Sequence, residues 1–368
     1  MEDRDYMLRA IELAKKGAGA TNPNPMVGAV IVKDGRIIGE GYHRKYGELH
    51  AERNALADCR ESAEGATIYV TLEPCCHYGK TPPCTEAIME HKLKRVVIGS
   101  RDPNPKVAGK GAKMLQEAGI EVVQDFMREE CDEINPVFFH YITKKTPFVA
   151  LKYAMTADGK IATKTGDSQW ITGETARKHV HILRNYYMGI LVGINTVLAD
   201  DPMLNVRLNS EETTYRNPVR IVCDTRLQIP LTSQLVNTAK EIKTIVATSL
   251  EETENQKVKA LEEKGVTVLF LPKKNQHVDL QQLLIKVGEL GIDGILVEGG
   301  GTVSGAFLDE KLVNRVYVYI GAKVFGGNSS YTPVKGDGAE KVNEALVLEK
   351  PKIMEFDEDV LLQYDVRG

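Results

Sequence analysis

The stretch 72-LEPCCHYGKTPPC-84 contains three of the six cysteines of the chain within ten residues, together with one histidine and three prolines. Such a loop could be held together by a disulfide, by a metal ion or by packing alone. Structural disulfides are rare in reducing compartments, so clustered cysteines in a protein of that kind favour metal binding or catalysis. Cys75 and Cys84 are the candidate zinc ligands of this loop, but two thiolates do not complete a site.

A third ligand is available upstream in 48-ELHAERNAL-56, where His50 precedes an expected helix. One imidazole and two thiolates hold zinc without net charge and can leave a fourth position open for water. Zinc makes such a water a nucleophile near neutral pH. Glu52 stands two residues after His50 and could move protons beside the metal. A histidine, a glutamate two positions later and a distant Pro-Cys pair are typical of zinc nucleobase deaminases.

Other interpretations of the cysteines stay open on the sequence alone. A closed structural zinc site would need a fourth ligand, for which Cys76 and His77 are the obvious candidates. A disulfide is the least favoured interpretation in a reducing compartment. We expect Cys59, Cys131 and Cys223 to act as small buried hydrophobic residues.

The composition describes a globular protein of about two domains. The chain has 368 residues, 42% of them hydrophobic and 27% charged, with a formal net charge of −4. This length exceeds one ordinary core, and the charge argues against a broad nucleic-acid-binding surface. The charged N-terminus lacks an apolar signal core, and no run approaches the roughly 18 apolar residues of a membrane helix. We therefore expect a cytoplasmic protein that does not bind membranes or nucleic acid.

Helical and strand-like segments alternate along both halves, which predicts two layered α/β domains. A polar stretch near Lys144–Thr146 separates them, so we predict domains over residues 1–144 and 147–368. In the first domain we expect an opening helix, a hairpin around Asp34-Gly35, helices near 51–59, 85–91 and 113–118, and the strands "TIYVTLEP", "RVVIGS" and "IEVVQ". In the second we expect a helix carrying Ala176, Val180, Leu183 and Tyr187, and the strands "PFVALKYA", "GILVGINT", "RIVCDT", "KTIVATS", "VTVLFLP", "DGILVEGGG" and "NRVYVYIGAKV".

"HAE" followed by "PCCHYGKTPPC" resembles the deaminase half of the bifunctional riboflavin biosynthesis deaminase–reductases. Eight residues separate Cys75 from Cys84, and this insertion is characteristic of that family, as is "NPNPMVGAV" near the start. Cys76 departs from the family pattern, which has serine there, and leaves a spare thiol near the metal. The resemblance implies a cytidine-deaminase-like α/β/α fold with His50, Cys75 and Cys84 as zinc ligands and Glu52 as the catalytic acid/base.

The same resemblance implies a set of residues that hold the deaminase substrate: Asn24, His43, His77, Lys80, Asp102 and Asn104. Lys80, in a glycine-bearing loop, suits a phosphate, although lone lysines are usually just solvated. Asp102 and Asn104 flank prolines in "RDPNP" and could instead be turn residues.

The second half contains 295-ILVEGGGTVSGAFLDEKLV-313, a strand, three glycines and a helix. Glycines there let backbone amides approach a phosphate, although the motif alone is weak. "LKYAMTADGKIA", "GDSQWIT" and "LVGINTVLADDPMLNVR" join it in resembling the reductase half of the same family. That half is similar to dihydrofolate reductase, and the resemblance implies a dihydrofolate-reductase-like α/β domain that uses NADPH.

The resemblance implies NADPH contacts from Ala154, Trp170, Thr196, Asp200, Gly300, Gly301, Thr302, Val303, Ser304, Gly305 and Ala306. It implies substrate contacts from Ser168, Arg184, Leu204, Arg207 and Glu298, and Lys152 could reach the sugar that is reduced. Three of these residues have a plainer alternative. Trp170 could pack in the core, Arg184 could lie on a solvated helix face, and Lys152 could lie on an exposed strand.

In this family the substrate is 2,5-diamino-6-ribosylamino-4(3H)-pyrimidinone 5′-phosphate. We expect the first domain to remove its ring amino group with zinc and the second to reduce the ribose of the product to a ribityl chain with NADPH. We also expect a homo-oligomer. Two alternatives differ in class: a nucleic-acid deaminase, which would need clustered basic and aromatic residues, and a structural zinc module on a nonenzymatic scaffold.

Overall fold

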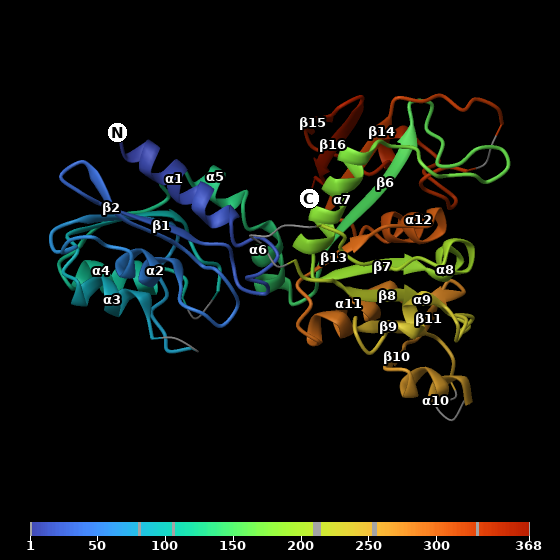
Figure 1. Ribbon diagram of the computed structural model, residues 1–368, viewed down its shortest axis with the longest axis horizontal. Coiled ribbons are helices and arrows are strands. Elements are labelled where there is room, and N and C mark those ends of the chain that lie inside the picture. The colour runs from blue at the N-terminus through green and yellow to red at the C-terminus, as the bar shows by residue number, and fades with distance from the viewer. Residues whose placement is uncertain are drawn as a thin grey trace. The chain divides into compact units, whose positions relative to one another are not determined.

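The computed structural model describes residues 2–79, 82–104, 107–208, 215–251, 256–328 and 331–367. The chain divides into two compact units, Met1–Lys145 and Thr146–Gly368 (Figure 1). Each is described by itself below. Both units combine helices with a central sheet, so the α/β fold class predicted for both halves is confirmed.

The N-terminal unit is built on a five-stranded sheet with the order β2-β1-β3-β4-β5. Its strands are β1 (Gly28–Lys33), β2 (Arg36–Tyr42), β3 (Thr67–Leu72), β4 (Arg95–Ser100) and β5 (Glu121–Val123). β1 and β2 form the expected antiparallel hairpin, and Asp34 and Gly35 take the positive φ angles, 49° and 73°, that its turn requires. β3, β4 and β5 are parallel, so the carboxyl ends of β3 and β4 meet at one edge.

Helices cover both faces of this sheet. They are α1 (Asp3–Lys15), α2 (Ala51–Ala57), α3 (Cys84–Glu90), α4 (Lys110–Glu117), α5 (Arg128–Asp132) and α6 (Pro136–Lys144). α2, α3 and α4 lie on one face, and α1 and α5 lie on the other (Figure 1). The core between the sheet and α2–α4 is made of alanine, valine, leucine and isoleucine side chains.

α5 and α6 were not predicted, and α4 begins three residues before the predicted helix 113–118, because none of these segments has a long apolar repeat. α5 has five residues and buries only Cys131, while α6 begins with Pro136 after its N-cap Asn135. Proline at the first helical turn is favourable because its missing N–H would have no helical partner there. The polar stretch predicted near Lys144–Thr146 thus begins at the last residue of a helix.

The C-terminal unit has a nine-stranded sheet with the order β10-β9-β8-β7-β13-β6-β14-β16-β15. The strands are β6 (Phe148–Thr156), β7 (Gly189–Gly193), β8 (Val219–Cys223), β9 (Thr244–Thr248), β10 (Val266–Phe270), β13 (Gly294–Val297), β14 (Arg315–Gly321), β15 (Lys352–Phe356) and β16 (Asp359–Asp365). A separate two-stranded hairpin comprises β11 (Lys273–Lys274) and β12 (His277–Val278). The sheet is parallel from β10 to β14, and β16 and β15 add an antiparallel edge.

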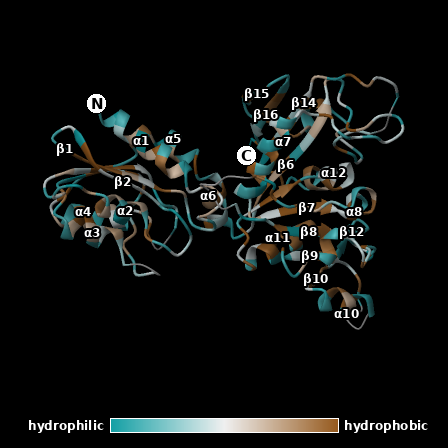
Figure 2. Cartoon of the chain, in the orientation of Figure 1, coloured by the Kyte–Doolittle hydropathy of each residue, from teal (hydrophilic) through white to brown (hydrophobic). Residues whose placement is uncertain are grey.

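Within the described residues, six α-helices accompany this sheet: α7 (Glu174–Tyr186), α8 (Ile194–Asp200), α9 (Gln234–Asn237), α10 (Gln256–Glu263), α11 (Leu280–Glu289) and α12 (Gly301–Asp309). α11 and α12 pack on one face, and α9 and α10 pack on the other. β7, β9 and β13 are buried along their whole length, as expected of parallel strands covered on both sides. Figure 2 shows hydrophobic residues concentrated along the strands, whereas the helices carry both hydrophobic and hydrophilic residues.

None of the six cysteines forms a disulfide. Cys131 is fully buried, as predicted, whereas Cys59 and Cys223 are only partly buried and pack at the margins of two hydrophobic clusters. Among the described residues, no helix has the length and apolar character needed to cross a membrane.

Candidate active sites

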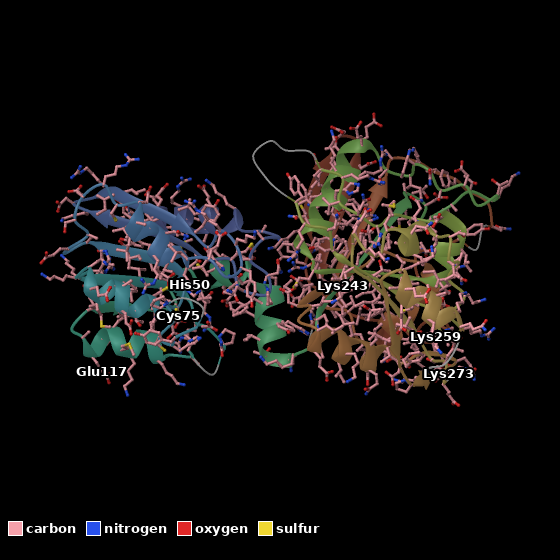
Figure 3. The ribbon with its side chains drawn as sticks, turned by 60° about the horizontal axis from the view of Figure 1, so that its bottom comes forward. His50, Cys75, Glu117, Lys243, Lys259 and Lys273 are labelled. Atoms are coloured by element: carbon pink, nitrogen blue, oxygen red, sulfur yellow. The ribbon has the colours of Figure 1, made fainter. Side chains whose placement is uncertain are left out.

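Three elements bring together a histidine and two cysteines in the N-terminal unit. His50 is the N-cap of α2, Cys75 follows β3, and Cys84 is the first residue of α3. The Nδ1 atom of His50 lies 3.5 Å from Sγ of Cys75 and 3.4 Å from Sγ of Cys84. Figure 3 shows His50 and Cys75 next to each other. In the described part of the chain, these three form a cluster whose donor atoms all lie within 4.8 Å of one another.

The charges of the two thiols are coupled. The hydrogen bond with Cys84 lowers the pKa of Cys75, and the same contact raises the pKa of Cys84. The Cys75 contact also raises the pKa of His50. The two thiols therefore favour a single negative charge, and two thiolates together need a positive charge between them. Two sulfur donors and one imidazole nitrogen match the ligand preference of zinc, so the residues present fit this metal.

Glu52 lies in the first turn of α2, and only 3% of it is exposed. Burial raises the pKa of its carboxyl group, and the neighbouring Cys75 raises it further. A carboxyl group of this kind accepts and releases a proton closer to neutral pH than an exposed glutamate does. It is suited to acid/base chemistry.

A cavity of about 330 Å³ opens beside the cluster. Its walls include eight residues predicted for this half: Asn24, His43, His50, Glu52, Cys75, His77, Asp102 and Asn104. Cys84 is fully buried behind the wall. Lys80, the remaining predicted residue, lies outside the described residues. Among the described residues, neither Cys76 nor His77 belongs to the His50–Cys75–Cys84 cluster. The interpretation of a closed structural zinc site with Cys76 or His77 as fourth ligand therefore gains no support.

One wall of the cavity is an interlocked pair of side chains. His43 is buried, and its Nδ1 atom lies 3.1 Å from the carbonyl oxygen of Leu49, to which it donates. Its Nε2 atom then accepts from Nδ2 of Asn24, 3.4 Å away. Burial lowers the pKa of His43, so the ring stays neutral. The side chains of Asn24 and His43 are thus held in fixed orientations.

A buried asparagine that the sequence analysis missed holds this wall in place. Asn135 donates to the carbonyl oxygen of Met26 and accepts from the N–H of Met26, both at 2.8 Å. Its side chain therefore replaces a strand neighbour for the segment that carries Asn24. An Asn-Pro pair suggests only a helix start, so nothing in the sequence indicates this contact.

Two buried carboxylates complete the floor. Asp102 is 8% exposed, and burial raises the pKa of its carboxyl group to about 6 although it accepts from the N–H of Asn104. Glu73, also missed, accepts from the N–H groups of Gly109, Gly111 and Ala112 and so caps α4. The Nδ1 atom of His77 is buried and has no hydrogen-bond partner among the described residues, which leaves it available to a ligand of the cavity.

In the C-terminal unit, charged side chains meet at the carboxyl end of β13. Glu298 receives two hydrogen bonds from Arg184 of α7, at 2.6 and 2.9 Å, and lies 3.9 Å from Nζ of Lys152 on β6. Burial opposes ionisation of Glu298, but the charge and hydrogen bonds of Arg184, helped by Lys152, outweigh it and lower the pKa to about 2. Burial also lowers the pKa of Lys152.

The alternatives of a solvated Arg184 and an exposed Lys152 are therefore wrong, since only 13% and 15% of these side chains are accessible. Arg184 also donates to the carbonyl oxygen of Asn205 at 3.1 Å and so holds the segment that carries Leu204 and Arg207. Leu204 is buried in the core, whereas Arg207 is exposed.

A second cavity, of about 660 Å³, lies at the carboxyl ends of β7, β8 and β13. Five residues predicted to contact NADPH line it: Thr196, Gly300, Thr302, Val303 and Ala306. Gly299 has a φ angle of 132° that only glycine adopts easily, which lets the chain turn from β13 into α12. Oγ1 of Thr196 accepts from the N–H of Gly300 at 3.2 Å and fixes the loop.

Gly301 and Gly305 face another part of the chain. A Cβ atom at Gly305 would lie 1.5 Å from the carbonyl oxygen of Lys335, and one at Gly301 would lie 3.0 Å from that of Thr332. These two glycines therefore permit close packing of α12 against residues 332–335. Ser304 is buried in the same helix.

The other predicted residues do not line this cavity. Ala154 is partly buried on β6, and Ser168 and Asp200 are exposed. Trp170 is 56% exposed, so its placement in the core is wrong, and the guanidinium of Arg177 lies 4.5 Å from the centre of its ring. The sequence analysis missed His181, which is buried and accepts from the N–H of Arg207. A single histidine within a predicted helix does not indicate a contact with a distant segment.

Comparison with known proteins identifies both halves. Residues 1–100 match the family model described as the cytidine and deoxycytidylate deaminase zinc-binding region, and residues 147–362 match the RibD C-terminal domain. The riboflavin biosynthesis protein RibD of Actinobacillus pleuropneumoniae is 53% identical over 366 residues, which cover 100% of this chain and 96% of the relative. RibD of Aquifex aeolicus (strain VF5) is 47% identical over 361 residues, covering 98% and 97%.

Solved structures agree over the whole chain. RibD of Acinetobacter baumannii, form 1, is similar with a TM-score of 0.88 and 38% identity, covering 100% of this chain and 99% of that one. A diaminohydroxyphosphoribosylaminopyrimidine deaminase/5-amino-6-(5-phosphoribosylamino)uracil reductase from Thermotoga maritima has a TM-score of 0.83 and 42% identity, covering 99% and 98%. The chain thus belongs to the RibD family of riboflavin biosynthesis proteins and is a bifunctional enzyme that joins a zinc-binding deaminase to a reductase.

Proposed function

We propose that residues 1–144 deaminate 2,5-diamino-6-ribosylamino-4(3H)-pyrimidinone 5′-phosphate and that residues 147–368 reduce the product with NADPH. The relative from Thermotoga maritima carries both activities in its name. The observation that supports the first activity most is the cavity that Glu52 shares with His50, Cys75 and the polar side chains around them.

In this proposal His50, Cys75 and Cys84 hold the zinc ion, since their donor atoms converge and all three are kept in place by α2, β3 and α3. Zinc supplies Lewis acidity, which lowers the pKa of a nearby water. Glu52 takes a proton from the attacking water as the new C–O bond forms. It then gives that proton to the ring amino nitrogen, the C–N bond breaks, and ammonia leaves.

The remaining cavity residues orient the pyrimidine. Asn24 presents an amide group that neutral His43 holds in a fixed orientation, and His77 has a buried ring nitrogen that the described residues leave unpaired. Asp102 and Asn104 supply further polar groups. Lys80 is proposed for the phosphate because an ammonium suits a phosphate oxygen.

For the second activity we propose that NADPH, which supplies the hydride, lies along the cavity bordered by Thr196 and Gly300. Ala154, Trp170, Asp200 and residues 301–306 remain proposed contacts of the cofactor. Lys152 and Glu298 face the sugar, where the buried ammonium donates to a ribose oxygen and Glu298 keeps it oriented. Arg184 holds the loop that carries Leu204 and Arg207, and Arg207 and Ser168 bind the substrate phosphate.

The test is a paired assay on one preparation. Purified protein with the diaminopyrimidine phosphate should release ammonia without NADPH, and NADPH should be oxidised only after that release or when deaminated intermediate is supplied. Release of ammonia that requires NADPH would argue against two separate reactions. No ammonia release by zinc-loaded protein would exclude the deaminase substrate.

We also propose that the enzyme is a cytoplasmic homo-oligomer. The antiparallel edge strand β15 exposes Ile353, 63% accessible, which a second copy would cover. Light scattering coupled to size-exclusion chromatography gives the mass in solution, and a monomeric mass would refute this part.

A further inference from the structure

The second cavity has an end that the proposed cofactor contacts do not explain. Gly300 and Thr196 border one side of it. The turn after β8, with Thr225 and Arg226, and the β11–β12 hairpin, with Lys274 and His277, also line it.

Both walls of this end are fixed without a ligand. Asp224 is fully buried, and its carboxylate accepts from the N–H groups of Gln228 at 2.8 Å and Ile229 at 2.7 Å, which closes the turn. Oγ1 of Thr225 accepts from the N–H of Val278 at 3.3 Å and ties the hairpin to the turn. The turn thus presents Arg226 to the cavity on a rigid base.

The two cationic side chains at this end of the cavity, Lys274 and Arg226, differ in whether they form an ion pair. Nζ of Lys274 is paired with Glu310 at 3.0 Å. Arg226 is exposed, and within the described ranges its guanidinium makes no ion pair and no side-chain hydrogen bond. Asp309 and Asp337 also line the cavity, but neither pairs with Arg226 there. The guanidinium of Arg226 therefore faces the cavity without an ion-pair partner among the described residues. Its planar set of N–H donors suits phosphate oxygens.

The order of the strands indicates which phosphate group of a bound dinucleotide would reach Arg226. The reducing centre lies at β6 and β13, where Lys152 and Glu298 meet, and the Gly300 loop lies between β13 and β7. The strands follow in the order β8-β7-β13-β6, so β8 lies roughly 14 Å from β6 at the usual strand spacing. A dinucleotide with its nicotinamide at β6 and its pyrophosphate at the Gly300 loop extends its adenosine toward the end of β8.

We infer that Arg226 binds the 2′-phosphate of NADPH and makes the reductase prefer NADPH to NADH. This inference rests on the proposed function and adds a specificity-determining residue to it. Lys274 and His277 border the same subsite from the hairpin.

The experiment compares Arg226→Gln and Arg226→Glu with the matched control Lys273→Gln. Lys273 is an exposed cation of the same hairpin that does not line the cavity. We expect the KM for NADPH to rise by about 10–100-fold in Arg226→Gln, the loss of a charged hydrogen bond, and further in Arg226→Glu. The KM for NADH and the kcat should stay unchanged, and the control should behave as wild type.

Binding of 2′,5′-ADP and of 5′-ADP by calorimetry, without substrate, separates the inference from the proposed function. The wild type should bind 2′,5′-ADP more tightly, and Arg226→Gln should bind both alike. An unchanged NADPH-to-NADH ratio in Arg226→Gln, or a wild type that binds both fragments equally, would overturn the inference. A protein that oxidises neither cofactor would refute the reductase assignment, while the fragment comparison would still decide the role of Arg226.

Discussion

Glu52 is the residue on which the deaminase chemistry depends most. Glu52→Gln keeps the size of the side chain but cannot relay a proton at neutral pH. General acid/base catalysis contributes about 10²–10⁴-fold, so the rate of ammonia release should fall by at least 10²-fold. Zinc content should remain at the wild-type level because Glu52 is not among the ligand cluster. Ammonia release at the normal rate would remove Glu52 from the mechanism.

The neighbouring thiols Cys75 and Cys76 should differ in their effect on metal binding. Cys75 lies 3.5 Å from the ring nitrogen of His50, whereas Cys76 is outside the cluster. Elemental analysis should find about one zinc per chain in Cys76→Ser and a loss of zinc in Cys75→Ser and Cys84→Ser. Full zinc in Cys84→Ser with none in Cys76→Ser would reverse the ligand assignment.

Asp102 gives a prediction about pH. Burial raises its folded-state pKa from 3.8 to about 6, so deprotonation is harder in the folded protein than in the unfolded chain. The penalty is absent below pH 3.8, grows between about pH 4 and 6, and is complete above. Asp102→Asn keeps an acceptor for the N–H of Asn104 and should be more stable than wild type at neutral pH, on the order of 2–3 kcal/mol.

Thermal unfolding of Asp102→Asn and wild type across this range provides the measurement. The stability difference should shrink as the pH falls from 7 to 4. A constant difference at every pH would mean that packing, and not the charge of Asp102, separates the two proteins.

At the scale of elements, the deaminase cavity depends on α6, because Asn135 at its N-cap holds the segment that carries Asn24. Asn135→Ala leaves the N–H and carbonyl groups of Met26 without this buried partner, which should cost about 1–3 kcal/mol of unfolding free energy. The KM for the pyrimidine should rise more than kcat falls, since Glu52 and the zinc ligands are untouched.

Asn135→Ser, which retains a hydroxyl group, serves as the matched variant and should recover part of the stability and of the KM. Steady-state kinetics and thermal unfolding on the same preparations decide this prediction. Equal KM values in wild type and Asn135→Ala would show that the loop keeps its position without α6.

At the scale of the whole molecule, the chain carries two sites built from separate sets of residues in two compact units. Lys152→Met should abolish most of the NADPH oxidation, because it removes the buried ammonium near Glu298, and should leave ammonia release unchanged. Glu52→Gln should have the opposite pattern.

Mixing Lys152→Met with Glu52→Gln should restore the complete conversion of the diaminopyrimidine phosphate, since one variant supplies the intermediate that the other reduces. NADPH oxidation in the mixture, compared with each variant alone, is the readout. Failure of the mixture, with each single activity intact, would mean that the intermediate does not leave the protein that makes it.

The sequence by itself determined the metal chemistry, the order of the two halves and the family. The two-residue spacing of His50 and Glu52 and the alternation of helices and strands are local patterns. Cys75 and Cys84, which lie 25 and 34 residues from His50, were predicted from the motif that the chain shares with the family. The expectation of an α/β fold and of a bifunctional deaminase–reductase was therefore confirmed.

Only the tertiary structure decided which distant residues support these sites. Asn135 and Met26 are 109 residues apart, and Arg184 and Glu298 are 114 apart. It also excluded the alternative of Trp170 in the core and showed that Gly305 packs against Lys335. Hydrogen bonds and close packing between remote segments follow from how strands and helices are laid beside each other, and single-residue propensities carry no information about such contacts.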